Sequence, residues 1–340
     1  MFQIKIYSIS LLLLGVIKIN LKEVLSQIKA NKKSSAYTVV NFDHSDKVFV
    51  GLDNDDKPCV FILVTSNEQF PSITTAQIKV EFSRRYALLL DGNEKKEGLF
   101  HGIFCLSKEK IDISTFISIL EYVLIEIGDN ITIESINSVF RSLVNLFSIK
   151  PSQDYPTERR GLWAELYFMK HYRDFNFWIH SWHSEPTRLF DFSSPSKRIE
   201  IKSTIRSERI HDFSHGQLLA LPSEKIIIVS FMLQEDDSGL SLKSLIEQAR
   251  TALSSTLYSL KLQKAIRVAN MLEAEEEGPK FNESHVIRKL EWFDSKDVPK
   301  FPILEPQGVS GTHYKSDLTQ ASKLSSEEIE NCINKWNLPE

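Results

Sequence analysis

The sequence has few of the features that mark secreted or zinc-binding proteins. Its 340 residues include three cysteines, which lie far apart and form no Cys-x-x-Cys pair: Cys59, Cys105 and Cys332. Separated thiols of this kind predict buried, reduced side chains in a cytoplasmic protein rather than a disulfide framework or a cysteine zinc site. The histidine pairs His180/His183 and His211/His215 have the spacing of ligand pairs, but no further ligand cluster follows, which argues against zinc.

Long hydrophobic runs are also lacking. An apolar run at residues 6–17 is too short to span a bilayer. It is similar to the apolar part of a signal peptide, yet no small-residue cleavage site follows, and an amphipathic pattern continues through residues 21–25. We therefore expect a buried helix or a first strand here rather than a signal sequence or a membrane anchor. A start codon placed upstream of the true one would be another explanation.

The chain lacks a glycine-rich phosphate-binding loop, a helicase motif, internal repeats and low-complexity tracts. We therefore expect any ATP-driven step to require a partner protein. The net charge is −4 and the pI is about 6.2, so no global basic character marks nucleic-acid binding. A protein that binds DNA needs only a local basic patch, so this charge does not exclude DNA.

With 42% hydrophobic residues, the chain can bury a large core, and its length predicts two domains, residues 1–150 and 151–340. In the first, short β-rich runs between polar turns predict a curled sheet or a small sandwich, followed by two helices. The strands are expected at 47–51, 59–65, 76–84, 87–91 and 99–106, and the helices at 113–127 and 133–147. This domain is expected to serve either in recognition or in partner binding, and its residues do not decide between these roles.

The sequence does contain an acid followed by a Glu-x-Lys triplet inside an apolar strand. Asp191 precedes the run Arg198-Ile199-Glu200-Ile201-Lys202-Ser203-Thr204. Residues two apart on a strand point to the same side, so Glu200 and Lys202 share one face while the isoleucines beside them point into the core. Asp191 lies at the end of the preceding hairpin arm and can approach Glu200 across it. Two carboxylates suit Mg²⁺, and the lysine can orient an attacking water and stabilise charge on a phosphate.

Acid-x-Lys triplets also occur elsewhere, at Asp55/Lys57, Glu94/Lys96 and Asp294/Lys296. Their turn-like, polar surroundings indicate ordinary surface charges. Only Glu200 and Lys202 are embedded in β-branched residues with an upstream acid. A cross-strand salt pair on the surface would explain the triplet alone, so the interpretation as a site depends on further elements.

One such element is a helix expected at residues 157–169, with Thr157 as its N-cap. Its apolar stripe is formed by Leu162, Leu166 and Met169. Glu165 falls on that stripe, and a carboxylate on a core-facing side is costly unless it is paired or coordinated. A metal site between this helix and the following sheet would remove the cost. The alternative is a buried Glu165 paired with Arg159 or Arg160.

The rest of the second domain supports a sheet covered by helices. A fully buried strand is expected at residues 225–233, because both faces of its isoleucine-rich run are apolar. Helices at 242–258 and 262–272 would cover the sheet. A last helix, at 325–336, would begin with a capping box formed by Ser325 and Glu328.

This order of elements resembles the PD-(D/E)XK nuclease superfamily, which includes many restriction endonucleases. More narrowly, residues 161–219 are similar to a bacterial family of PD-(D/E)XK motif proteins. The matching segments are Gly161-Leu162-Trp163-Ala164-Glu165-Leu166-Tyr167-Phe168, Trp182, Asp191-Phe192, Glu200-Ile201-Lys202-Ser203-Thr204 and His215-Gly216-Gln217-Leu218. The chain departs from the pattern in having no proline directly before Asp191, and in the segment 211–215 before Gln217.

The resemblance implies an α/β (α+β) fold: a restriction-endonuclease-like core with a mixed central sheet flanked by helices, preceded by a β-rich N-terminal domain. It implies that Asp191, Glu200 and the backbone carbonyl of Ile201 hold Mg²⁺, with Mn²⁺ as a substitute. Lys202 would then orient the attacking water. Glu165 would support the metal from the helix, and Gln217 would contact DNA or the lysine.

Such proteins are encoded near restriction–modification and phage-defence genes, so the resemblance implies a DNA substrate. Candidate partners are a methyltransferase or an ATPase/helicase of a defence system, with no membrane, and a homodimer would readily cut both strands. Basic residues near the site in sequence are candidates for phosphate contacts: Arg188, Lys197, Arg198, Arg206 and Arg209. The alternative for each is a solvated charged rim.

Two other functions fit the same residues. The fold can serve as a non-catalytic DNA-binding or assembly subunit of a restriction complex, although the intact Asp191, Glu200 and Lys202 argue against this. A repair nuclease or an RNA nuclease is the other alternative, since these residues do not distinguish one nucleic acid from another.

Overall fold

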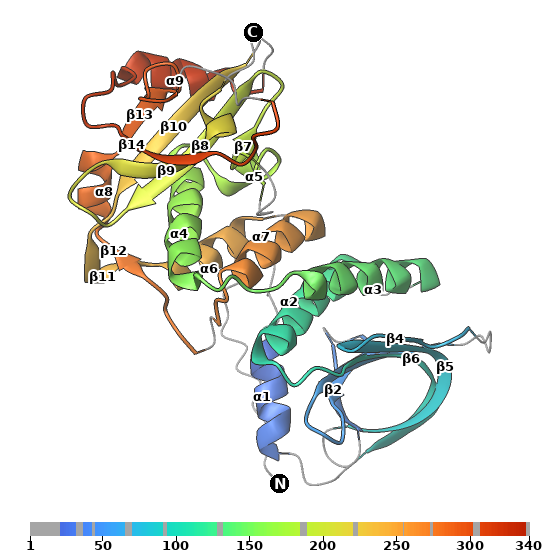
Figure 1. The fold of residues 1–340 in the computed structure, drawn as a ribbon. Coiled ribbons are helices and arrows are strands. Elements are labelled where there is room, and N and C mark those ends of the chain that lie inside the picture. Colours follow the sequence, from blue (N-terminus) through green and yellow to red (C-terminus); the bar gives the residue numbers. More distant parts are fainter. Residues whose placement is uncertain are drawn as a thin grey trace. The chain divides into compact units, whose positions relative to one another are not determined.

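The computed structural model describes the chain in eleven segments, which leave out the N-terminal twenty residues and short stretches elsewhere. These segments are 21–31, 37–42, 45–64, 70–90, 94–127, 132–183, 189–219, 224–253, 255–272, 275–301 and 307–337. The apolar run at residues 6–17 lies outside them. The chain forms two compact units (Figure 1), residues 1–74 with 79–106 and residues 75–78 with 107–340. This division falls after Leu106 rather than at the expected residue 150.

The first unit is built on a sheet that closes on itself (Figure 1), together with helix α1 (Leu21–Asn31). Its strands are β1 (Tyr37–Asn41), β2 (Val48–Leu52), β3 (Pro58–Leu63), β4 (Ile73–Thr74), β5 (Ile78–Leu89) and β6 (Lys95–Cys105). The order is β1-β2-β3-β6-β5-β4, and a further β1–β5 pairing closes the ring. The ring itself consists of β1, β2, β3, β6 and β5, and β4 pairs with β5 outside it. Antiparallel neighbours cannot alternate fully around a ring of five strands, so one pair must be parallel, and this pair is β1–β5.

The interior of this ring is aromatic. Phe61 lies 4.9 Å from Tyr86 and 5.5 Å from Phe104 between ring centroids, and Tyr37 lies 5.0 Å from Phe61. Such edge-to-face contacts stabilise a small core beyond the burial of area alone. The expectation of a curled, β-rich first domain is therefore confirmed.

The strands expected at 76–84 and 87–91 form the single strand β5. The two consecutive arginines, Arg84 and Arg85, are both exposed, and in the sequence they resemble the polar residues of a turn. Ser83 just before them has a positive φ of 47°, which disturbs the alternation of faces without ending the strand. A local change in backbone conformation of this kind leaves no clear sign in the residue types.

Helices α2 (Lys110–Ile127) and α3 (Ile133–Ser148) belong to the second unit because they pack on α7 (Thr256–Val268). The guanidinium of Arg267 on α7 lies 2.7 Å from Asp112 on α2, and both side chains are buried. Arg267 also donates to the carbonyl of Ile149 after α3, at 2.6 Å. These helices were expected in the first domain because their sequence does not show which partner buries them.

The second unit is centred on a mixed sheet of order β13-β10-β8-β7. The strands are β7 (Phe192–Ser193), β8 (Lys197–Thr204), β10 (Lys225–Met232) and β13 (Glu291–Asp294). Strands β8 and β10 are parallel, and the other two pairs are antiparallel. A separate two-stranded ribbon consists of β9 (Ile210–Ser214) and β14 (His313–Asp317).

Strand β10 is buried on both sides, as its composition predicted. Ile227 and Val229 belong to a core shared with α4 (Tyr155–His171), α6 (Leu242–Ala252) and α7. The alternate residues Ile226 and Ile228 pack with Phe213 of the ribbon. The central sheet is therefore covered by helices on one face and in part by the β9–β14 ribbon on the other.

Shorter elements complete the second unit: α5 (Phe175–Ile179), η2 (His215–Gln217), β11 (Glu235–Ser241), β12 (Lys280–Phe281), α8 (Glu283–Lys289) and α9 (Ser326–Asn334). The capping box of Ser325 and Glu328 at the start of α9 is confirmed. Among the described helices, none is both long and apolar enough to cross a membrane.

Two expected helix boundaries were wrong. Helix α4 begins at Tyr155 with Asp154 as N-cap, so Thr157 is not the cap. Pro156 in the first turn explains this, because proline is well tolerated where backbone N–H groups have no intrahelical partner. The helix expected at 242–258 is divided: α6 ends at Ala252, and α7 begins with Ser255 as its N-cap.

The buried ion pair between Arg267 and Asp112 predicts a large loss of stability for Arg267→Ala. The substitution leaves the Asp112 carboxylate buried without its cation, and we expect a loss of about 3–5 kcal/mol in the free energy of unfolding. Urea unfolding followed by tryptophan fluorescence would measure it. In the control Lys110→Ala, the ion pair with Glu275 is exposed (69% and 50% of the two side chains), and we expect a loss below about 1 kcal/mol. Equal losses would contradict this account.

Candidate active site

The pairing of β7 with β8 brings Asp191 to the strand that carries the Glu-x-Lys triplet. Phe192 lies opposite Ile199 in this antiparallel pair, so Asp191 comes next to Glu200. One carboxylate oxygen of Asp191, Oδ2, accepts a hydrogen bond from the backbone N–H of Ile201 at 2.6 Å. The predicted approach of Asp191 across the hairpin is thus seen in the structure.

Glu200 and Lys202 extend from the same face of β8, as the two-residue period predicted. The ammonium Nζ of Lys202 lies 2.8 Å from Oε1 of Glu200, and the Glu200 residue is 5% exposed. The intervening Ile201 and the preceding Ile199 are buried in the core on the other face. The pair therefore lies within the fold, and the alternative of a salt bridge on the surface does not apply.

Gln217 of η2 links these two charged groups. Its amide nitrogen donates to Oε1 of Glu200 at 2.6 Å and to the carbonyl of Leu189 at 3.1 Å. Its amide oxygen accepts from Nζ of Lys202 at 3.2 Å and from the backbone N–H of Ser214 at 3.0 Å. These four contacts fix the orientation of the amide, with its donor toward the carboxylate and its acceptor toward the ammonium. Gln217 therefore contacts the lysine, which was one of its two expected roles.

Glu165 reaches the same region from α4. Its Oε2 accepts a hydrogen bond from the indole N–H of Trp182 at 2.6 Å. The alternative pairing does not form: Arg159 pairs with Glu276 at 2.7 Å, and Arg160 donates to Thr157. Trp182 was expected only as part of the family pattern, and its role as the partner of Glu165 was missed.

The segment that carries Trp182 is held by a lysine from α7. Nζ of Lys261 donates to the carbonyls of Ile179, His180 and Trp182 at 2.8, 3.1 and 3.1 Å. These carbonyls follow the end of α5, where backbone acceptors have no helical partner. Lys261 therefore anchors the turn that brings the indole of Trp182 to Glu165.

The three carboxylates disfavour one another's ionisation. Burial raises the pKa of Glu165 to about 8, and the charge of Glu200 acts in the same direction against the hydrogen bond from Trp182. The pKa of Asp191 is raised well above its usual range by burial and by the charges of Glu200 and Glu165. Burial also raises the pKa of Glu200, against the nearby Lys202. Three acids with a single ammonium favour the binding of a further cation when they ionise.

The donors present fit a hard divalent cation. Among the described residues, no group of three histidine, cysteine, aspartate or glutamate side chains is arranged to hold a metal ion. Mg²⁺ requires less, since it is commonly held by one or two carboxylates and keeps several waters. Asp191 and Glu200 provide two such carboxylates, and the carbonyl of Ile201 stays the expected third donor.

The histidines do not form a zinc site in the described part of the chain. His180 contacts the hydroxyl of Tyr258, His211 that of Ser230, and His215 that of Tyr314. The rings of His180, His211 and His215 thus each form a hydrogen bond to a hydroxyl group.

Three of the basic residues expected to contact phosphates are engaged within the protein. Arg209 is buried and paired with Glu291 at 2.8 Å. Lys197 is buried and donates to the carbonyl of Lys335. Arg198 is partly buried and paired with Glu224 at 2.6 Å, and it also donates to Ser194. These internal acceptors, which the sequence does not show, make the cationic groups less available to a phosphate, and their contact with DNA stays a prediction.

Of the remaining two, Arg206 is exposed just after β8 and stays a candidate for phosphate contacts. Arg188 lies outside the described residues.

A comparison with protein families gives a match over most of the chain. A family model described as "Putative PD-(D/E)XK family member" (DUF4420) matches residues 21–319. The matched region covers most of both structural units and all the residues of the candidate site. No curated protein matched the chain. No solved structure matched it either.

The raised pKa of Glu165 predicts how stability depends on pH without divalent cations. In the unfolded chain Glu165 loses its proton near pH 4.5, whereas in the folded protein it keeps the proton up to about pH 8. The folded state binds more protons between these values, so stability falls as pH rises through this window. Melting temperatures at pH 5, 6.5 and 8 should fall less steeply in Glu165→Gln than in the unsubstituted protein. Glu283→Gln, at a partly exposed carboxylate paired with Lys170, should keep the original slope. Equal slopes for all three would contradict the burial of an acidic proton at Glu165.

Divalent cations should stabilise the folded protein through Asp191 and Glu200. We expect Mn²⁺ or Mg²⁺ to raise the melting temperature, and to do so more at pH 8 than at pH 6, because the ligands must lose their protons. Asp191→Asn and Glu200→Gln should abolish the increase. Asp236→Asn, at a partly exposed acid of β11, serves as control and should leave it unchanged. An equal increase in all the variants would indicate nonspecific binding.

Proposed function

We propose, from the premise that the chain belongs to the PD-(D/E)XK family whose model matches residues 21–319, that it is a divalent-metal-dependent DNA endonuclease. The observation that carries this proposal is the meeting of Asp191, Glu200 and Lys202 at one face of β8. The first two offer oxygen ligands, and the third is an ammonium 2.8 Å from the Glu200 carboxylate. The family has a nuclease-like fold, and this arrangement supports hydrolysis rather than binding alone.

The residues of the site would have different roles in the hydrolysis of a phosphodiester. Asp191, Glu200 and the carbonyl of Ile201 would hold Mg²⁺ or Mn²⁺. When bound, such an ion supplies Lewis-acid stabilisation of the charge that develops on the phosphate and makes water a better nucleophile. Lys202 would orient the attacking water and stabilise negative charge on a phosphate oxygen.

Gln217 and Glu165 would act on these groups. Gln217 contacts both Glu200 and Lys202. It would therefore keep the distance between these two side chains when the Glu200 carboxylate turns from Lys202 to a metal ion. Glu165, with a pKa raised to about 8, would retain or accept a proton near the site, and Trp182 fixes its position. We propose direct in-line attack by water, with no covalent intermediate on the protein.

The biological setting is proposed from the family resemblance. We propose that the protein acts in a restriction–modification or phage-defence system, with a methyltransferase or an ATPase/helicase as partner. The closed sheet of the first unit would recognise DNA or bind that partner. A homodimer would provide two active sites for the two strands of a duplex.

The test is cleavage of plasmid and phage DNA, modified and unmodified, in the presence of Mg²⁺ or Mn²⁺. We expect cutting that requires the metal and falls on the order of a hundredfold or more in Lys202→Ala, since the substitution removes the charge next to the reacting phosphate. Lys243→Ala serves as the matched control, because this lysine on α6 pairs with Glu277 away from the site and should be dispensable. An RNA substrate in parallel separates a DNA nuclease from an RNA nuclease.

Two outcomes would decide against this proposal. Cutting that persists unchanged in Lys202→Ala would show that the activity arises elsewhere. An absence of cutting on every substrate, by protein that binds Mn²⁺ normally, would favour a non-catalytic subunit that requires a partner.

A further inference from the structure

A single hydroxyl interrupts the apolar strand β10 next to the candidate site. Ser230 lies directly opposite Lys202 in the parallel β8–β10 register, two positions beyond the pair Ile228–Glu200. Paired residues in neighbouring strands project from the same face of a sheet, so Ser230 is on the face that carries Glu200 and Lys202. It is 0% exposed, and a hydroxyl buried in this way needs hydrogen-bond partners within the protein.

Ser230 has two polar partners, which together define how its proton is used. Nη1 of Arg209 lies 2.7 Å from its Oγ, and Nε2 of His211 also lies 2.7 Å from it. A guanidinium can only donate, so the serine oxygen accepts from Arg209. Among the described residues, Nε2 of His211 is the one acceptor within hydrogen-bond distance of this hydroxyl, so we direct the serine proton to His211. Nε2 of His211 is then the acceptor, and the neutral ring carries its hydrogen on Nδ1.

The surroundings of His211 agree with a neutral ring. Burial, together with the charges of Lys202 and Arg209, lowers the pKa of His211 to about 3. The imidazole therefore adds no further positive charge beside Lys202 at neutral pH. A neutral acceptor is also what the hydroxyl of Ser230 requires.

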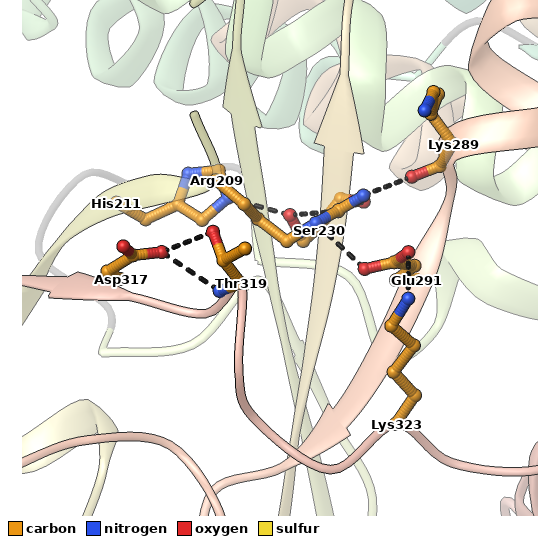
Figure 2. A network of polar contacts seen from close by, with 8 residues as sticks. All are labelled: Arg209, His211, Ser230, Lys289, Glu291, Asp317, Thr319 and Lys323. Carbon is orange, nitrogen blue, oxygen red and sulfur yellow. Dashed lines mark hydrogen bonds and ion pairs between the residues drawn. The ribbon is translucent and has the colours of Figure 1, made fainter. Parts of the chain in front are cut away.

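Arg209 extends these contacts across several elements (Figure 2). It donates to the carbonyl of Ser230 at 2.9 Å and to that of Lys289, at the end of α8, at 2.6 Å. Its Nε pairs with Glu291 of β13 at 2.8 Å, and Glu291 pairs with Lys323 at 2.5 Å. The residue just before β9 is thus joined to β10, α8 and β13 at once.

These side chains join β9 to β10 by polar contacts, which add to the apolar packing of Phe213 on Ile226 and Ile228. In the described part of the chain, β9 forms its ladder with β14, in a ribbon separate from the central sheet. Phe213 of β9 nevertheless lies over the site, with its ring centroid 5.0 Å from Nζ of Lys202. The backbone N–H of Ser214 also holds the amide oxygen of Gln217. A displacement of β9 would therefore change the contacts of Lys202 and Gln217 together.

We propose that Ser230, His211 and Arg209 are positioning residues, which anchor β9 across the β8–β10 pair and thereby keep Lys202 and Gln217 in place for catalysis. The part of this inference that concerns catalysis rests on the proposed function. The anchor itself rests only on the contacts of the buried hydroxyl. In the described part of the chain, no side-chain hydrogen bond or ion pair joins these three residues to Asp191, Glu200 or Lys202, and they act through β9.

The first test concerns the anchor and requires no enzymatic activity. ¹⁵N NMR of the His211 ring should show the tautomer with hydrogen on Nδ1 and no titration between about pH 5 and 8. Ser230→Ala should increase amide hydrogen exchange within residues 210–214 about tenfold or more, because a buried ring nitrogen loses its partner. His211→Gln, which can still accept from Ser230, should exchange nearly as slowly as the unsubstituted protein, whereas His211→Leu should behave as Ser230→Ala.

The second test concerns catalysis and separates positioning from general stability. In Ser230→Ala we expect kcat to fall about tenfold or more, with unchanged KM for DNA and unchanged Mn²⁺ affinity. The single variant His211→Gln, which can still accept from Ser230, should keep most of the rate of the unsubstituted protein. Val139→Ala on α3 is the control, since it removes buried methyl groups of the same unit far from the network in sequence and fold. It should lower the melting temperature and leave kcat unchanged.

Several results would overturn the inference. One is a His211 ring that carries its hydrogen on Nε2 or is protonated at pH 7, and another is unchanged exchange of β9 in Ser230→Ala. A loss of kcat shared equally by Val139→Ala would reduce the role of these residues to stability. If the unsubstituted protein cuts no nucleic acid, the proposed function fails, and the exchange of β9 still decides the anchor: faster exchange in Ser230→Ala supports it, and unchanged exchange refutes it.

Discussion

Three carboxylates share one ammonium at the face of β8, and this imbalance of charge is the constraint on which the arrangement around it depends. Glu165, Asp191 and Glu200 come from α4, from the residue before β7 and from β8, so the imbalance couples elements distant in sequence. Each acid has a dedicated donor: the indole of Trp182, the backbone N–H of Ile201, and Lys202 together with Gln217. These donors reduce the repulsion without removing it, and a site of this kind favours a cation.

Further side chains and strands hold these donors in position. Lys261 fixes the turn that carries Trp182, and the ribbon of β9 and β14 fixes Gln217 through Ser214. The ribbon is in turn held by Arg209 and His211, which reach the buried hydroxyl of Ser230. Functional groups are usually held to within fractions of an ångström by such surrounding contacts. The polar groups of this unit thus form a continuous set from the core to the site.

Local periodicity predicted much of this site from the sequence. The two-residue period of a strand placed Glu200 and Lys202 on one face, and the short hairpin placed Asp191 beside them. The helical period placed Glu165 on a core-facing stripe, where a carboxylate requires a partner. The partners themselves, such as Trp182 and Ser230, were not predicted, because they lie 17 and 28 residues away from the groups they serve, Glu165 and Lys202. The same limit explains why Arg209, Lys197 and Arg198 were assigned to the surface, and why α2 and α3 were assigned to the wrong unit.

The hydroxyl of Ser230 has a consequence for the reading of related sequences. After Lys225, strand β10 reads Ile226-Ile227-Ile228-Val229-Ser230-Phe231-Met232, and only one of these seven positions is polar. In a strand covered on both faces, a solitary small polar residue indicates where a polar side chain from another element enters the core. Such a residue can thus serve as a landmark for aligning distant homologues, at a point where the acidic motif itself is too short to fix the register.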